Sequence, residues 1–243
     1  MCTLTWHRSP SGYTLFSNRD ERNTRLPALP PRMEGVKVKW LGPVDGDQGG
    51  TWILVNECGI TMGLMNGVFR EHSGKGKPRS RGLLVRDLAE SETIADVERN
   101  LGGVDPLQYR PFRFFALAPE EPFFFAEWTG QLLQMRHDPA ARPPVISSSF
   151  DESEVGRRRR AEYDRLRNGN DDPGVDLLKT YHRSHFPSPG PYSVCMHREE
   201  ARTQSLTRVD VTAEEVRMLY HAGPPCEEAA EFEAALARAG VRP

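Results

Sequence analysis

Short β-prone runs joined by tight turns recur along this chain and constrain its fold more than any other feature. Residues 3–8 (TLTWHR) and 12–17 (GYTLFS) flank Ser9-Pro10-Ser11-Gly12, whose residue types favour a turn. Residues 51–56 and 60–65 flank a second turn, Glu57-Cys58-Gly59. Strands joined by such short connections run antiparallel, because parallel strands need a long crossover. The pattern therefore predicts sheets that are largely antiparallel.

Further strand and helix patterns indicate the fold class. Strands are expected at 112–118, 123–128, 131–136 and 145–148, and a last hairpin at 192–198 and 203–209. Helices are expected at 82–101 with a break near Ser91, at 153–168, at 172–184 and at 226–239. Residues 22–50 read as a long loop with one alternating stretch at 36–40, and 216–220 fits either a strand or a helical turn. Two sheets with helices packed outside them predict an α+β fold.

Length and charge exclude several classes of protein. The 243 residues suit one large domain or two small ones, and we expect a single domain over 1–243. Lys and Arg number 32 against 34 Asp and Glu, so no basic excess indicates a nucleic-acid partner. Neither an apolar run of the roughly 18 residues that a spanning helix needs nor a signal-peptide pattern is present. We therefore expect a cytoplasmic protein.

The cysteines give no metal-binding signal in the sequence. They are widely spaced and include no CxxC pair: Cys2, Cys58, Cys195 and Cys226. Two disulfides are formally possible, but free thiols are the simpler expectation in a chain without a secretion signal. His182 and His185 are three residues apart, yet no third ligand is evident. We expect neither a metal site nor a cofactor.

Cys2 has a chemical property that no other position has. If Met1 is removed, Cys2 carries both a thiol and a free α-amine, whose ordinary pKa of about 7.7–8 suits proton transfer near neutral pH. A nucleophile activated by its own amine is one established arrangement. The alternative is that Cys2 is only the second residue of an edge strand. The first hairpin brings residue 2 opposite residues 17–20, so we expect Asn18, Asp20 and Glu21 beside it, with a charged surface turn as the alternative.

Four short motifs in order carry a resemblance to a known family. They are MCT at the start, NRDE at 18–21, GGTW at 49–52 and NECGITMGLMNG at 56–67. With softer matches at 145–149 and 201–205, the chain resembles the NRDE family, also called transport and Golgi organisation 2. The N-terminal half of that family is similar to the choloylglycine hydrolase and penicillin V acylase branch of the N-terminal-nucleophile hydrolases. The resemblance implies a four-layer αββα sandwich with two mostly antiparallel sheets.

The resemblance also implies a set of site residues. The implied catalytic residues are Cys2 as nucleophile, Asp20 as its hydrogen-bonding partner, Asn66 in the oxyanion hole and Arg202. The residues expected to contact substrate are Asn18, Arg19 and Ser148. Ser17 stands where the hydrolases carry an arginine, and Ser148 stands near an expected asparagine. Asn66-Gly67 is also a strong turn dipeptide, and Arg202 could instead pair with Glu199 or Glu200. The 22–50 and 68–82 segments are expected to shape the pocket.

Two functions follow as hypotheses. The first is a cysteine hydrolase or acyltransferase that acts through Cys2 on a C–N amide or acyl thioester bond, with no metal or cofactor. The second is a binding or trafficking module for an acyl, lipid or haem-like ligand on the same fold, because a fold does not settle a function. Either way we expect a small-molecule ligand, no nucleic acid and no membrane span. The oligomeric state is open.

Overall fold

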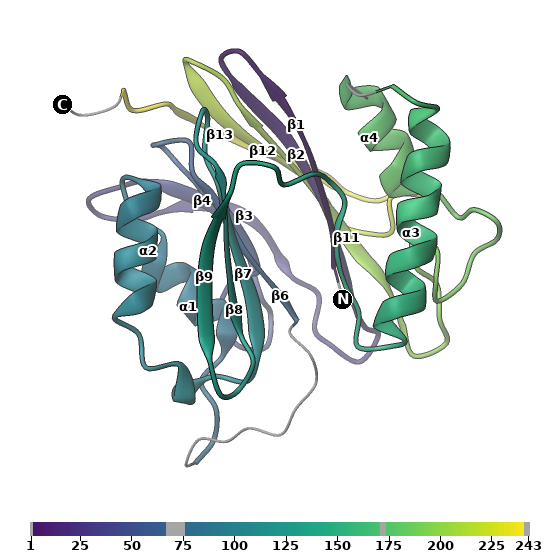
Figure 1. Cartoon of the computed structure of the whole chain (residues 1–243), viewed down its shortest axis with the longest axis horizontal. Coiled ribbons are helices and arrows are strands. Elements are labelled where there is room, and N and C mark those ends of the chain that lie inside the picture. Colours follow the sequence, from purple (N-terminus) through teal and green to yellow (C-terminus); the bar gives the residue numbers. More distant parts are fainter. Residues whose placement is uncertain (1, 67–75, 171–173, 241–243) are drawn as a thin grey trace.

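The computed structural model describes residues 2–66, 76–170 and 174–240, which form two antiparallel sheets with helices on their outer faces (Figure 1). The first sheet has the strand order β10 (Val145–Ser147), β1 (Cys2–Ser9), β2 (Gly12–Arg22), β11 (Ala201–Val211), β12 (Glu215–His221) and β13 (Glu231–Ala237). The second sheet has the order β3 (Leu29–Glu34), β4 (Trp40–Val44), β5 (Ile53–Asn56), β6 (Thr61–Asn66), β7 (Phe112–Leu117), β8 (Phe123–Trp128) and β9 (Leu133–Asp138). Both predicted N-terminal hairpins are confirmed as β1–β2 and β5–β6.

Helices cover the outside of both sheets, which gives the predicted four-layer αββα sandwich (Figure 1). α1 (Arg81–Leu88) and α2 (Ile94–Gly102) pack against the second sheet, and the predicted break near Ser91 separates them. α3 (Glu152–Arg167) and α4 (Gly174–Arg183) cover the first sheet. A third buried cluster fills the space between the sheets, where Leu4 and Leu15 of the first sheet meet Phe115 of the second.

The expected loop at 22–50 is wrong, because it contains two strands. β3 has the sequence LPPRME and lies at the edge of the second sheet. Proline lacks an N–H and is tolerated there, since an edge strand leaves half of its backbone groups unpaired. Most β3 side chains are at least partly exposed, so no alternation of apolar and polar residues marks the strand in the sequence. β4, in contrast, is buried along its whole length.

The C-terminal expectations also change. β11 pairs with β12 and not with residues 192–198, which contribute only one isolated bridge between His197 and Arg202. Residues 216–220 are therefore a strand. The expected helix at 226–239 is instead β13, which pairs with β12 from Glu215 opposite Ala237 to His221 opposite Glu231. A free sheet edge overrides the helix propensity of this Glu- and Ala-rich segment, because propensity is a weak preference.

Two further expectations concern the pocket-shaping segment at 68–82 and the absence of a membrane-spanning helix. Part of the expected pocket-shaping segment at 68–82 lies outside the described residues, whereas 76–82 is described. No helix in the described part of the chain combines the length and the apolar composition that crossing a bilayer requires.

Candidate active site

Cys2 begins β1 between two neighbouring strands and points into the space between the sheets. It lies opposite Ser147 of β10 on one side and Arg19 of β2 on the other. Side chains alternate along a strand, so Cys2, Leu4 and Trp6 join the core between the sheets. Cys2 is 8% exposed, at the end of that core where a cavity begins. A thiol on this face can meet a small molecule that enters the cavity.

Arg19 is the residue of the NRDE motif that pairs directly with Cys2, and Glu21, two residues further along β2, also lines the cavity. Paired residues on antiparallel strands project to the same side of the sheet. The Arg19 guanidinium carbon lies 4.5 Å from the centroid of the Trp52 ring, and its Nη2 lies 3.2 Å from Asp45 Oδ2. Arg19, Trp52 and Asp45 all line the cavity. Arg19 therefore lies at the cavity wall, on the same face of the sheet as Cys2.

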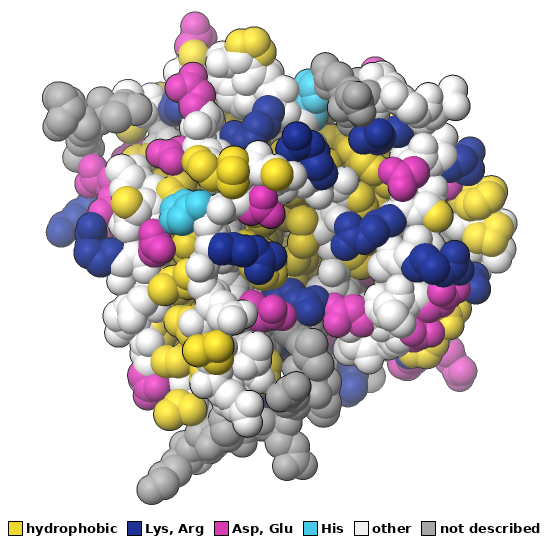
Figure 2. All heavy atoms as spheres, in the orientation of Figure 1, with side chains coloured by type: hydrophobic (Ala, Val, Ile, Leu, Met, Phe, Trp, Pro, Cys, Tyr) yellow, Lys and Arg dark blue, Asp and Glu magenta, His cyan; other side chains and the backbone are white. Residues whose placement is uncertain are grey.

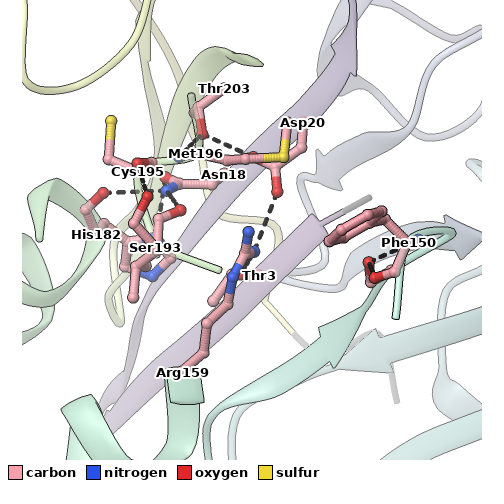
Figure 3. A network of polar contacts seen from close by, with 12 residues as sticks. Thr3, Asn18, Asp20, Phe150, Arg159, His182, Ser193, Cys195, Met196 and Thr203 are labelled. Atoms are coloured by element: carbon pink, nitrogen blue, oxygen red, sulfur yellow. Dashed lines mark hydrogen bonds and ion pairs between the residues drawn. The ribbon is translucent and has the colours of Figure 1, made fainter. Parts of the chain in front are cut away.

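Asn18 and Asp20 point to the other face of the same sheet, toward the helices (Figure 3). Asn18 Nδ2 donates to the carbonyls of His182 at 3.0 Å and Val194 at 3.1 Å. Asp20 accepts from Arg159 Nη1 at 3.0 Å and from Thr203 Oγ1 at 2.7 Å. Both side chains thus belong to a buried polar network that fixes β2 against its neighbours, and the expectation that Asn18 lies beside the nucleophile is wrong.

The buried network sets the protonation state of His182. Arg159 is fully buried, and its Nη1 also donates to Thr3 Oγ1 at 2.5 Å. Burial, and then the positive charge of Arg159, lower the pKa of His182 to about 3. The neutral His182 ring therefore lies between Asn18 Oδ1 at 3.0 Å and Thr5 Oγ1 at 2.9 Å. The Asp20–Arg159 ion pair and the neutral imidazole of His182 thus belong to one buried network on the helix side of β1.

The electrostatics around the Cys2 thiol are mixed. Burial raises its pKa most strongly, and the charges of Asp20 and Glu21 raise it further, whereas the positive charge of the N-terminus and then that of Arg19 lower it; the net direction is upward. Asp20 also appears among the residues that line the cavity, although its carboxylate is bound from the helix face. The thiol is therefore protonated at neutral pH in this arrangement, and a base must remove its proton before it can attack a carbonyl.

The cavity next to Cys2 has a volume of about 370 Å³ and is rich in cations. Among the residues that the structure describes, the basic lining residues are Arg19, Arg25, Lys77, Arg79, Arg81 and Arg110, against the three acidic residues Asp20, Glu21 and Asp45. Figure 2 shows charged side chains of both signs at this end of the space between the sheets. Asp45 is shared by Arg19 and Arg25. The positive charge around the cavity therefore exceeds the negative charge, which favours an anionic ligand.

Three of the cavity cations have no carboxylate partner in the described part of the chain: Lys77, Arg81 and Arg110. Arg81 donates to the Pro111 carbonyl at 2.9 Å. Burial, and then the positive charge of Arg110, lower the pKa of Arg81. A partly buried guanidinium beside a second cation is stabilised by an anion that enters the cavity.

The structure brings some of the other predicted residues to the cavity and leaves others away from it. Asn66 ends β6, is partly exposed and lines the cavity. Ser148 accepts from the backbone N–H of Phe150 at 3.0 Å and forms part of a turn. Its neighbour Ser147 lies opposite Cys2, and the buried Ser147 Oγ has no hydrogen-bond partner among the described residues. Arg202 lies half-exposed on β11, with Nη1 3.9 Å from Glu227 Oε2, and is not among the cavity residues.

Sequence reasoning missed Ser147, Asp45 and Arg81 as individual residues of the site. Asp45 and Arg81 fall within the two segments expected to shape the pocket, and their part in it agrees with that expectation. Trp52 was visible as the last residue of GGTW. Ser147 carries no signal of its own, because only the pairing of β10 with β1 reveals it.

A four-layer sandwich whose second residue is a cysteine aimed between the sheets has the fold of the N-terminal-nucleophile hydrolases. Penicillin V acylase from Agrobacterium tumefaciens is similar with a TM-score of 0.63 and 11% identity, over 96% of this chain and 85% of that one. A conjugated bile acid hydrolase from Clostridium perfringens is similar with a TM-score of 0.59 and 12% identity, over 96% and 92% of the two chains. The Caenorhabditis elegans orthologue of N-acylethanolamine-hydrolyzing acid amidase has a TM-score of 0.56 and 10% identity, over 86% and 92%.

A match to a family model assigns the chain more specifically than the shared fold does. The model of the family Transport and Golgi organisation 2 matches residues 1–137, and the chain belongs to this family. A search of curated protein sequences gives no significant match. At these low identities, the solved structures show a shared fold, and the activity is argued from the site.

Proposed function

We propose that this protein is a cysteine hydrolase or acyltransferase that acts on a C–N amide or acyl thioester bond of a small molecule through Cys2. The observation that carries the proposal is the placement of Cys2 at the start of an inner strand, opposite Arg19 and next to a cavity of about 370 Å³. Similar folds in proteins named as an acylase, a bile acid hydrolase and an acid amidase support it.

The chemistry begins with the removal of Met1, which frees the Cys2 α-amine. The amine takes the thiol proton while sulfur attacks the carbonyl carbon, and a tetrahedral oxyanion forms. The amide group of Asn66, at the cavity wall, donates to that oxyanion. The C–N bond then breaks, the leaving amine receives the proton, and an acyl thioester remains on Cys2. Water or another nucleophile attacks the thioester and restores the thiol.

Asp20 acts as a positioning residue in this scheme. Its carboxylate is fixed by Arg159 and Thr203 on the helix face, yet its charge reaches Cys2 across the strand pair. The negative charge favours a protonated group near Cys2, such as the ammonium that forms when the α-amine accepts the proton. Arg19 has the opposite effect and favours the thiolate.

The substrate class that fits the cavity is an acyl compound with an anionic group. Lys77, Arg81 and Arg110, which have no carboxylate partner among the described residues, are the residues that would bind a carboxylate or phosphate. A small acyl or lipid-like molecule would then place its carbonyl near Cys2 and its anionic end near Arg81. A cytoplasmic location fits the four free cysteines.

A specific observation favours a second candidate, a binding module without turnover. Burial raises the pKa of Cys2, and the Asp20 carboxylate is bound by other groups. A thiol that stays protonated can serve as a contact for an acyl or lipid-like ligand in the same cavity.

The two candidates are separated by the intact protein and by Cys2→Ala. We expect the purified protein to lack Met1 and to gain the mass of an acyl group on Cys2 after brief incubation with anionic acyl amides or thioesters. Cys2→Ala should bind the same compounds with unchanged affinity and release no product. Binding without any product in the parent protein would leave the second candidate, and turnover that survives in Cys2→Ala would contradict the nucleophile.

A further inference from the structure

Four metal-ligating side chains from three separate segments converge at one point outside the Cys2 cavity. They form the His2Cys2 cluster: His185, Cys195, His197 and Cys226. His185 follows α4, Cys195 and His197 precede β11, and Cys226 lies in the connection between β12 and β13. One nitrogen or sulfur atom of each residue lies within 4.8 Å of the corresponding atoms of the others. Neither histidine nor cysteine spacing in the sequence indicates this meeting.

Four of the six separations between these atoms lie within about 0.4 Å of those in a tetrahedron around a single ion. Zn–S bonds of about 2.3 Å and Zn–N bonds of about 2.0–2.1 Å place tetrahedral ligands about 3.8 Å apart for S and S, about 3.6 Å for S and N, and about 3.4 Å for N and N. The Sγ atoms of Cys195 and Cys226 are 3.4 Å apart. His197 Nε2 lies 3.6 Å from Cys195 Sγ and 3.4 Å from Cys226 Sγ. The two histidine Nε2 atoms are 3.1 Å apart.

Hydrogen bonding alone explains this arrangement poorly. Thiols are weak donors and weak acceptors, so His197 gains little from two sulfur neighbours. Two neutral imidazoles can share at most one proton between the facing Nε2 atoms. A disulfide would engage the sulfurs of Cys195 and Cys226 at about 2.05 Å, but it would leave both histidines aimed at a point with nothing to bind.

We propose that the His2Cys2 cluster binds one structural Zn²⁺. Two thiolates and two imidazoles in a tetrahedron are a ligand set typical of zinc, and the four ligands leave no open position for a substrate. Binding forms two Zn–S and two Zn–N bonds and releases two protons, one from each thiol. The bound ion would thus link the three segments of the chain as a structural site, and it takes no part in the reaction at Cys2.

The cluster is joined to the polar network under the Cys2 strand. Met196 lies between Cys195 and His197, and its backbone N–H donates to Thr203 Oγ1 at 2.8 Å. Thr203 Oγ1 donates in turn to Asp20 at 2.7 Å, and Figure 3 shows this path. The Cys195 N–H also donates to the Ser184 carbonyl at 3.0 Å, next to His185. A bound ion would therefore fix the lead-in to β11 and, through Thr203, the Asp20 carboxylate.

The test is the metal content of the full chain, purified in reducing buffer without chelators. We expect about one zinc per chain, and loss of at least nine-tenths of it in Cys226→Ser and in His197→Gln. Cys58→Ser and His137→Gln are the matched controls, because both residues lie outside the cluster, and they should keep their zinc. Metal removal should lower the unfolding temperature of the parent protein, and added zinc should restore it.

A second measurement keeps the test decisive if the variants do not fold. Cobalt added to the metal-free parent protein should give the visible bands of tetrahedral Co²⁺ and a thiolate charge-transfer band, and zinc should displace both. A parent protein that holds no zinc before or after reconstitution would overturn the proposal. So would a parent protein in the same reducing buffer whose mass is lower by two hydrogens, with Cys195 linked to Cys226.

Discussion

Cys2 and Arg19 face each other across β1 and β2 and point into the same cavity, whereas Asp20, the next residue along, points to the opposite face and pairs with Arg159. The NRDE motif therefore divides between two layers of the fold. Arg19 and Glu21 line the cavity, whereas the side chains of Asn18 and Asp20 form their hydrogen bonds on the helix side. This division sets separate expectations for reactivity and for stability.

Arg19 should control the reactivity of the Cys2 thiol. Its charge lowers the pKa of Cys2, so Arg19→Leu should raise that pKa and slow alkylation of Cys2 near pH 7. The rate should fall several-fold, because a smaller fraction of the thiol is then present as the reactive thiolate. Peptide mapping after timed alkylation gives the rate, with Cys58 as the internal reference. Arg22→Leu, at the exposed end of β2, should leave the rate unchanged; an equal loss there would contradict a specific role for Arg19.

The pair of Asp20 and Arg159 should matter mainly for stability. Both side chains are fully buried, so Asp20→Ala leaves a charged guanidinium without its partner. We expect a loss of about 3–5 kcal/mol in the free energy of unfolding, measured by denaturant titration. Asp20→Asn keeps the side-chain shape and should cost less. Arg157→Ala on the exposed face of α3 is the control and should leave the unfolding midpoint in place.

His182 should make the protein sensitive to acid. Its pKa is lowered to about 3 by burial and by Arg159, whereas an unfolded histidine titrates at about 6.5. The unfolded state therefore binds more protons in this window, and stability falls as the pH decreases from about 6.5 toward 3. The slope should reach about 1.4 kcal/mol per pH unit. Unfolding titrations at pH 7, 6 and 5 should show this slope, and His182→Gln should reduce it, whereas His137→Gln should not.

Arg81 should select for anionic ligands, and Arg202 should not. Arg81→Met should weaken binding of an anionic acyl compound by tenfold or more, with little effect on a neutral analogue, because one charge-assisted contact is lost. Arg202 is not among the residues that line the cavity, so Arg202→Ala should change neither affinity. Calorimetry on both variants with both compounds measures the difference. Equal losses for the anionic and neutral compounds would contradict the anion-binding role.

Much of the fold can be predicted because its signals are local. The turn between Ser9 and Gly12 fixes β1 and β2, and it also fixes their register: pairing steps outward from Ser9 and Gly12 to Cys2 and Arg19. The sequence thus already contains the reason why Arg19, and not Asn18 or Asp20, faces Cys2. β3 and β13 cannot be predicted in the same way, because each becomes a strand only through the neighbour that it extends.

The site is harder to predict than the fold, because its residues come from distant segments. Position 2 draws attention to Cys2, and the family motifs indicate Asn66. Arg159 lies on a helix whose charge pattern indicates only a solvated surface, yet it is fully buried against Asp20. The His2Cys2 cluster draws on three segments around β11 and β12, so no spacing rule indicates it.

The pairing of Cys2 on both sides has a practical consequence for anyone who handles this protein. Cys2 pairs with Arg19 on one side and Ser147 on the other. A purification tag or fusion partner attached before Cys2 would therefore extend from the protein at a point next to the cavity. Such a tag would cap the α-amine and stand in the path of incoming molecules. β13 forms the opposite edge of the first sheet and is separated from β1 by three strands, β2, β11 and β12. If an N-terminally tagged preparation is inactive, the tag itself is a sufficient cause. Assays should therefore use a tag placed after β13.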